Sequence, residues 1–137
     1  MGTKRLKYIS FLILSLLMAV FLLSSFVFSI NGMPVALTTA LKKGNYKEIA
    51  KSFDETVELE ILGQEGIYSK IQAEQVLKTF FSKNMPIDFL TVHEGGKDSA
   101  LYAIGKLSTK NGNFRVNFLF KSQKILQLRI ELENGNK

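Results

Sequence analysis

His93 is the only imidazole in the chain and the first candidate for acid–base chemistry. Histidine is a frequent general base in enzymes and a common contact for polar ligands. Here it begins the string HEGG (93–96), so a turn-stabilising role is the competing interpretation. An even count of residues in the loop 95–98 would turn Leu90 and Val92 inward and His93 outward or toward the rim. An odd bulge would reverse these faces.

A small cavity enzyme of the isomerase or cyclase type needs a buried carboxylate base and a tyrosine or protonated acid to stabilise an oxyanion. Tyr68 and Asp88 are the residues that would join His93 in such a site. The strand positions expected to face the interior contain no Asp, Glu or Tyr, and no phosphate loop, nucleophile elbow or dinucleotide fingerprint occurs. We therefore predict no catalytic residue, and the enzyme remains the alternative hypothesis.

Metal and cofactor sites are not expected. The chain has one His and no Cys, which leaves only carboxylates as metal ligands. Glu58 and Glu60 alternate with apolar residues, as on a strand with one solvated face. The lack of Cys also excludes disulfides, a cysteine nucleophile and a lipoprotein anchor.

The N-terminal segment indicates export. Three cations precede an uncharged apolar run: Lys4, Arg5 and Lys7, then residues 9–28. Val27 and Ser29 are small enough for a signal-peptidase site, so we expect a signal peptide over 1–29 and a single periplasmic domain over 30–137. The alternative is an uncleaved anchor that spans the inner membrane and leaves the domain on its outer side.

Half of the net charge of +6 lies in this leader. Three of the 18 Lys and Arg residues lie there, which leaves 15 cations against 12 Asp and Glu in the rest of the chain. No Lys/Arg cluster interleaved with aromatic residues occurs. We predict no nucleic-acid partner, and membrane contact only through an uncleaved N-terminal segment.

The hydrophobic pattern of the remaining chain changes from helical to extended. Helices are predicted over 34–43, after Asn45, and after Ser69, where Ser69 and Gln72 form a capping-box signature. In the third helix the apolar residues have the spacing of one helical face: Ala73, Val76, Leu77, Phe80 and Phe81. Strands are predicted at 56–61, 67–68, 87–94, 99–109, 113–121 and 124–133.

The turns predict the register of the last three strands. Asn111-Gly112 is typical of a two-residue type I′ turn, which would place Leu107 opposite Val116. The following hairpin is expected to pair Phe118 with Leu128, Val116 with Ile130 and Arg115 with Glu131.

These registers give the sheet one apolar and one mixed face. The apolar face, which the three helices would cover in an α+β domain, comprises Leu101, Ala103, Leu107, Phe114, Val116, Phe118, Phe120, Leu126, Leu128, Ile130 and Leu132. On the mixed face we predict the interface residues Tyr102, Ile104, Arg115, Leu119, Ile125 and Arg129. The alternative is a solvated convex face with scattered apolar residues.

Four strings carry a resemblance to a known family: ALKKGNYKEIAKSFD (40–54), YSKIQAEQVLKTFF (68–81), HEGG (93–96) and YAIGKLSTKNGNFRV (102–116). Together they resemble a family of small exported bacterial proteins of unknown function within the nuclear-transport-factor-2-like superfamily. The resemblance implies a cone: a curved antiparallel sheet of about six strands covered on one face by three helices. It also implies frequent dimerisation through the sheet, and it assigns no reaction.

The sequence therefore favours an exported binding or interaction module that is not an enzyme. One hypothesis is a small apolar ligand inside the cone, contacted by His93, Tyr68, Phe81 and Phe118. The other is a homodimer through the mixed sheet face.

Overall fold

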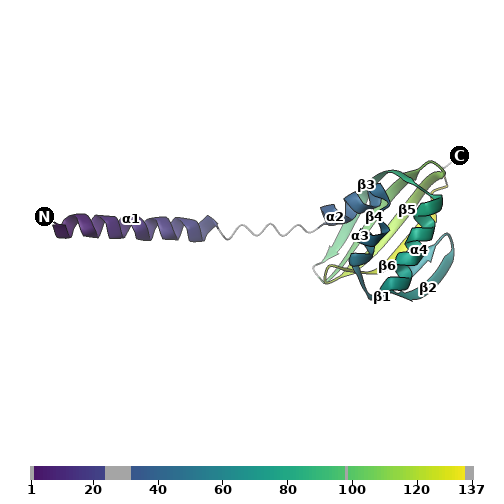
Figure 1. Ribbon diagram of the computed structural model, residues 1–137, viewed down its shortest axis with the longest axis horizontal. Helices are drawn as coiled ribbons and strands as arrows, with labels where there is room; N and C mark the ends of the chain where they lie inside the picture. Colours follow the sequence, from purple (N-terminus) through teal and green to yellow (C-terminus); the bar gives the residue numbers. More distant parts are fainter. Residues whose placement is uncertain (1, 24–31, 98, 135–137) are drawn as a thin grey trace. The chain divides into compact units, whose positions relative to one another are not determined.

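The computed structural model describes residues 2–23, 32–97 and 99–134, and the chain divides into two units, Met1–Ile30 and Asn31–Lys137 (Figure 1). The first unit contains helix α1 (Gly2–Leu23), which includes the basic residues and most of the apolar run. In the described part of the chain, no helix is both long and apolar enough to cross a membrane. The candidate cleavage site at Val27 and Ser29 lies outside the described residues.

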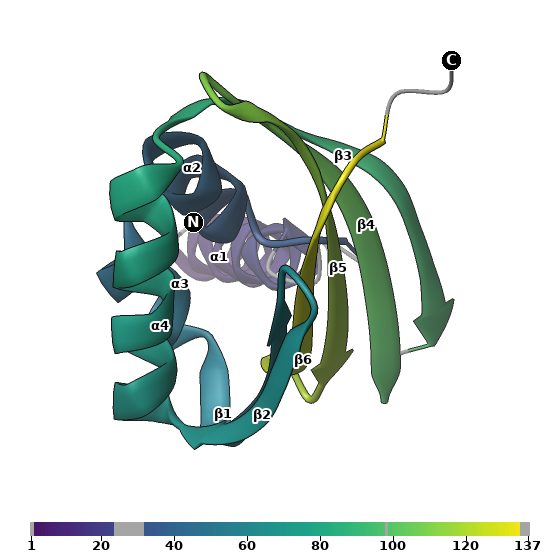
Figure 2. The ribbon, with the colours of Figure 1, turned by 90° about the vertical axis from the view of Figure 1, so that its right-hand side faces the viewer.

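The second unit is an α+β domain of three helices and six strands. Its elements are α2 (Val35–Lys43), α3 (Tyr46–Lys51), β1 (Phe53–Ile61), β2 (Gln64–Ser69), α4 (Lys70–Lys83), β3 (Pro86–Lys97), β4 (Ala100–Thr109), β5 (Gly112–Lys121) and β6 (Lys124–Leu132). The strands form one curved sheet in the order β2-β1-β6-β5-β4-β3. Figure 2 shows α2, α3 and α4 on the same side of this sheet, which confirms the predicted fold class.

One strand pair departs from the expected antiparallel sheet. β1 and β6 are parallel, whereas every other neighbouring pair is antiparallel. The chain leaves β1 through β2 and α4, builds β3, β4 and β5 as a meander, and returns so that β6 runs beside β1 in the same direction. The parallel pair thus joins the first and the last strand of the sequence within the sheet, whose edges are β2 and β3.

Local capping explains where the helices begin. The Asn45 side chain accepts a hydrogen bond from the Glu48 amide at the start of α3. At the start of α4, Ser69 and Gln72 form the predicted capping box. The Glu48 carboxylate contacts Lys51 instead of returning to Asn45, so α3 has a simple N-cap and not a full box.

The concave side of the sheet is filled by apolar side chains from both layers. The predicted stripe of α4 faces inward, and Phe80 packs edge-to-face against Phe81 and Phe114, with ring centroids 5.3 Å apart in each pair. The largest fully buried side chains are Phe53, Phe89, Leu41, Ile49, Leu59, Leu77, Leu107, Ile125, Leu128, Ile130, Val57 and Val116. Burial of each such side chain contributes roughly 1.5–3 kcal/mol before conformational entropy is subtracted.

The turn between β4 and β5 differs from the prediction. Thr109 pairs with Gly112, so the two loop residues are Lys110 and Asn111, and Leu107 faces Phe114 instead of Val116. Of the residues in this turn only Gly112 has a positive φ, at 125°, which excludes a type I′ turn. The Asn111 side-chain amide donates to the carbonyl of Lys83 at the end of α4. This contact with another element explains why the local Asn-Gly signal was misleading.

The β5–β6 hairpin has the predicted pairs but an unexpected end. Phe118 lies opposite Leu128 and Arg115 opposite Glu131, as expected. A bulge between Leu119 and Phe120 shifts the register, however, so that Phe120 pairs with Ile125. Ile125 is therefore fully buried, and its assignment to the outer interface is wrong. The bulge inverts the face at this end of β6, which also leaves Leu126 only half-buried.

Candidate functional site on the outer sheet face

A second bulge determines the face that His93 occupies. In the β3–β4 register, Thr91 pairs with Gly105 and His93 with Ile104, so Val92 is the extra residue. His93 therefore shares the outer face with Ile104 and is exposed to solvent. Both Leu90 and Val92 are also exposed, so the expectation that they face inward when His93 faces outward is wrong. Phe89 occupies the inward position instead.

His93 is paired with a tyrosine on the neighbouring strand. Its Nε2 lies 3.1 Å from the Tyr102 hydroxyl, and the two ring centroids are 5.6 Å apart. Tyr102 also lies across Gly95, where an added Cβ would be 2.5 Å from Tyr102 Cζ. A glycine at this position of β3 leaves the space that the phenol ring fills, so Gly95 and His93 together orient Tyr102.

Apolar and cationic residues continue this surface onto β5. Leu119 lies opposite Tyr102, and Arg115 lies opposite Lys106. Tyr102 is 42% exposed and Leu119 is 38% exposed, so both offer apolar surface to a partner. We name the set His93, Tyr102, Ile104, Arg115 and Leu119 the outer-face patch. Aromatic residues, arginine and aliphatic residues in this combination are typical of protein interfaces.

Charged pairs flank the patch on β6 and β1. Arg129 Nε lies 2.6 Å from Glu60 Oε2, and Arg129 Nη1 lies 3.9 Å from Glu131 Oε1. Gln127 donates to Glu58 over 2.8 Å. The predicted interface residue Arg129 is thus half-buried and held by carboxylates of its own chain. Glu131 contacts Arg129 and not its strand partner Arg115, for which no ion pair occurs among the described residues.

Three of the four predicted interior ligand contacts, all except His93, belong to the core or pack against it. Phe118 is only 2% exposed and stacks on Phe120 at a centroid distance of 5.7 Å. Phe81, on the inward side of α4, is also buried. Tyr68, on β2, is half-buried, and its ring lies over Gly66. Their contacts are with other core residues, so these three side chains support the fold directly.

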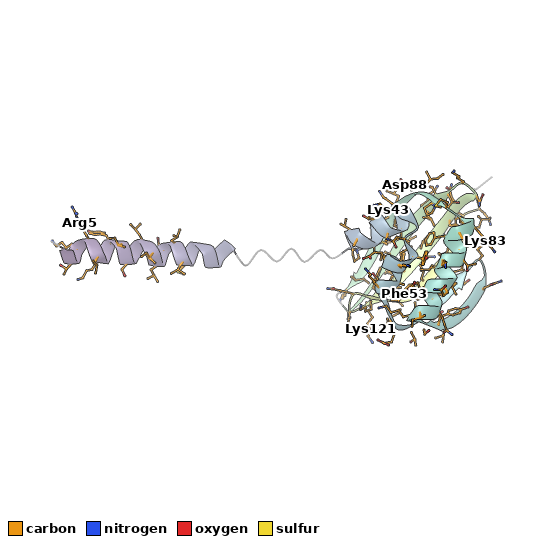
Figure 3. All side chains as sticks on the ribbon, viewed as in Figure 1. Arg5, Lys43, Phe53, Lys83, Asp88 and Lys121 are labelled. Carbon is orange, nitrogen blue, oxygen red and sulfur yellow. The ribbon has the colours of Figure 1, made fainter. Side chains whose placement is uncertain are left out.

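The three residues of the enzyme hypothesis do not converge. His93 is on the outer face of the edge strand β3, whereas Tyr68 is on β2, the opposite edge of the sheet. The Asp88 carboxylate, labelled in Figure 3, is solvent-exposed. It lies 3.5 Å from Lys42 Nζ. Among the residues that the structure describes, no three His, Asp or Glu side chains gather as metal ligands.

Glu94 has a role that the sequence did not reveal. It pairs with Ala103, an inward position, and its Oε1 accepts a hydrogen bond from the Met33 amide over 2.7 Å. The Met33 side chain is buried, with its sulfur 3.8 Å from Thr91 Oγ1. Glu94 thus fastens the segment before α2 to β3. The HEGG string marked this place, but no local pattern indicated a partner 61 residues away.

The sheet and its three helices define the class of protein: the domain has the nuclear-transport-factor-2-like fold. An NTF-2 like protein of unknown function from Burkholderia xenovorans has the same fold, with a TM-score of 0.58 and 10% identity over 74% of this chain and 80% of that chain. The chain itself belongs to the DUF4783 family, a domain of unknown function whose model matches residues 35–131.

Solved relatives agree with this assignment. A DUF4783 family protein from Bacteroides ovatus is 36% identical over 74% of this chain and 96% of that chain, with a TM-score of 0.71. One from Bacteroides fragilis is 37% identical over 74% and 99% of the two chains, with a TM-score of 0.69. No protein with a curated description matches the chain. The resemblance found in the sequence is thereby confirmed.

Proposed function

We propose that this DUF4783 protein is an exported interaction module without enzymatic activity, and that its outer-face patch binds a second copy of the chain. The observation that carries the proposal is the placement of His93 and Tyr102. The only imidazole and its phenol partner lie on an exposed apolar surface, while the concave side is occupied by core side chains. Binding at the outer face needs no rearrangement of the core.

The charge distribution supports self-association. Lys106 lies on β4, where it contacts Glu133 over 3.1 Å, whereas Glu131 and Glu60 lie on β6 and β1, where both contact Arg129. A two-fold interface uses the same surface on both copies. If the two-fold axis is directed along β5, β4 of one copy lies over β6 of the other, and Lys106 meets Glu131 twice. On the axis the two Leu119 side chains then form an apolar contact, whereas the two Arg115 side chains face each other, so the two Lys106–Glu131 contacts must outweigh that repulsion.

Export is supported by the N-terminal pattern. A basic start followed by an uncharged apolar run is typical of a signal peptide, and α1 is helical over this segment. We propose that cleavage after Ser29 releases the domain into the periplasm. An interaction module that needs no cofactor could function in the periplasm without any cofactor being transported there from the cytoplasm.

Sedimentation velocity of residues 30–137, the chain that the proposed cleavage would leave, tests the dimer without the apolar N-terminal helix. Leu119→Arg places a second cation beside Arg115 at the centre of the proposed interface, and we expect it to shift a dimer to monomer. Ile71→Arg is the matched control, because Ile71 is 76% exposed on α4, in the helical layer. A wild-type monomer at high micromolar concentration, or a Leu119→Arg dimer as stable as the control, would contradict the proposal.

A further inference from the structure

Lysines from separate segments meet at the end of α3. The ammonium groups of Lys70 and Lys124 each lie 3.4 Å from the backbone carbonyl oxygen of Lys51. Lys70 is 19 residues and Lys124 is 73 residues from Lys51 in the sequence. Lys121 lies opposite Lys124 in the β5–β6 hairpin. We name Lys51, Lys70, Lys121 and Lys124 the lysine cluster.

The backbone beneath the cluster is held by regular structure. The Ile125 amide donates to the carbonyl of Ser52 over 2.7 Å, which ties the start of β6 to the end of α3. Phe53 and Ile125 continue this contact as the first pair of the parallel β1–β6 ladder, and both are buried. Figure 3 shows Lys121 and Phe53 at the same end of the domain. The lysines therefore converge because the fold brings their backbones together.

Among the described residues, only one lysine of the cluster contacts a carboxylate. Lys51 Nζ contacts Glu48 Oε2 over 2.7 Å. Within the described residues, no carboxylate lies within ion-pair distance of Lys70, Lys121 or Lys124. The nearby Asp54 carboxylate accepts a hydrogen bond from the Glu55 amide. Cations held together without anions repel each other, and an added anion relieves that repulsion.

We propose that the lysine cluster is a binding site for a phosphate-class oxyanion. Because both ammonium groups lie 3.4 Å from one oxygen, they are at most twice that distance apart. A charge-assisted hydrogen bond from an ammonium to an oxyanion spans about 2.8 Å, so one phosphate group can accept from Lys70 and Lys124 together. Lys121 adds a third cation. Lysine binds phosphate as a flexible point charge, which suits either a free phosphate ester or a lipid headgroup.

The first test measures binding of inorganic pyrophosphate to the full chain in neutral detergent at low salt, by titration calorimetry. Lys70→Gln/Lys124→Gln should weaken binding at least tenfold, whereas Lys70→Arg/Lys124→Arg should retain it. The matched control is Lys78→Gln/Lys83→Gln, which removes two exposed lysines from α4 outside the cluster. Melting temperatures of all variants verify that the domain is folded.

The second test separates the two sources of phosphate. The same variants are sedimented with phosphatidylglycerol–phosphatidylcholine vesicles and with pure phosphatidylcholine vesicles. Because every variant retains α1, any difference between variants reports on the lysines. If Lys70→Gln/Lys124→Gln loses the additional vesicle binding that phosphatidylglycerol produces, the ligand is a lipid headgroup. If the substitutions weaken only pyrophosphate binding, the ligand is a soluble phosphate compound. Absence of saturable binding to both probes, or equal binding by the Lys70→Gln/Lys124→Gln variant and its control, would overturn the proposal.

Discussion

Gly105 lies in the middle of β4, beneath the ring of Phe89 from the edge strand β3. A Cβ added at Gly105 would be 2.5 Å from Phe89 Cε2 and 3.2 Å from the carbonyl oxygen of Leu90. Phe89 is 1% exposed, so its ring cannot turn into solvent without leaving the core. We therefore predict that Gly105→Ala destabilises the domain by forcing Phe89 out of its position.

The expected magnitude follows from these contacts. Overpacking a filled core costs about 1–3 kcal/mol. Complete expulsion of Phe89 would set an upper limit of about 3–5 kcal/mol, the usual cost of removing a buried phenylalanine. We expect about 2–3 kcal/mol for Gly105→Ala. This is a large part of the stability of a small domain, which is about 5–15 kcal/mol.

Gly95→Ala is a matched control on the same sheet. Its Cβ would also meet an aromatic ring, 2.7 Å from Tyr102 Cε1, but Tyr102 is on the exposed face and can turn into solvent. The loss should stay below about 1 kcal/mol, as for most surface substitutions. Both substitutions add one methyl group against an aromatic ring. The difference between their unfolding free energies therefore measures the cost of displacing the buried ring of Phe89.

Urea denaturation followed by circular dichroism gives the free energy of unfolding for each variant. A double-mutant cycle with Phe89→Leu tests the cause, because leucine lacks the distal ring atoms that meet the new Cβ. In that background Gly105→Ala should cost less than about 1 kcal/mol, which corresponds to a coupling of at least about 1 kcal/mol. Equal costs in both backgrounds, or equal effects of Gly105→Ala and Gly95→Ala, would refute the steric argument.

Four further outcomes are expected. Leu62 has a φ of 53°, so Leu62→Asn should raise the free energy of unfolding by about 1 kcal/mol in urea denaturation, and a decrease would contradict the strain. Ser69→Ala removes the capping box of α4 and should lower the unfolding free energy by about 1 kcal/mol, whereas an unchanged urea midpoint would show that the cap contributes nothing. Glu94→Ala removes the acceptor of the Met33 amide, whose hydrogen exchange should accelerate about fivefold, and an unchanged rate would exclude this fastening role. The intact mass of protein from the cell envelope should match residues 30–137, and the mass of the full chain would contradict cleavage.

The core stabilises the domain, whereas the outer-face patch is available for binding. Phe81 and Phe118 are buried and pack within the core. His93 and Tyr102 contribute little to the free energy of unfolding because they are exposed. Variants on the patch should therefore alter association without unfolding the domain. Single substitutions in the outer-face patch can therefore test the proposed self-association while the domain stays folded.

Helix starts, the inward stripe of α4 and the identity of the strands were all predictable from the sequence. Ser69, Gln72 and Asn45 act on backbone groups within three residues of themselves, so their roles depend on neighbours in the chain. The core face of β4 and β5 was also predictable, although the register was wrong by two residues. Because side chains alternate with a period of two, a shift of two residues keeps every side chain on its face.

The faces of His93 and Ile125 depended on the folded domain. In each case a bulge of one residue inverts the alternation, and its position is set by packing across the sheet. Phe89 occupies the core before the bulge in β3, and Ile125 pairs with Phe53 before the bulge in β6. The lysine cluster has the same origin, since residues 51, 70 and 124 meet only through the parallel β1–β6 pair and the start of α4. Contacts between residues far apart in the chain leave no local pattern, because the free energy that selects them comes from burying the whole core.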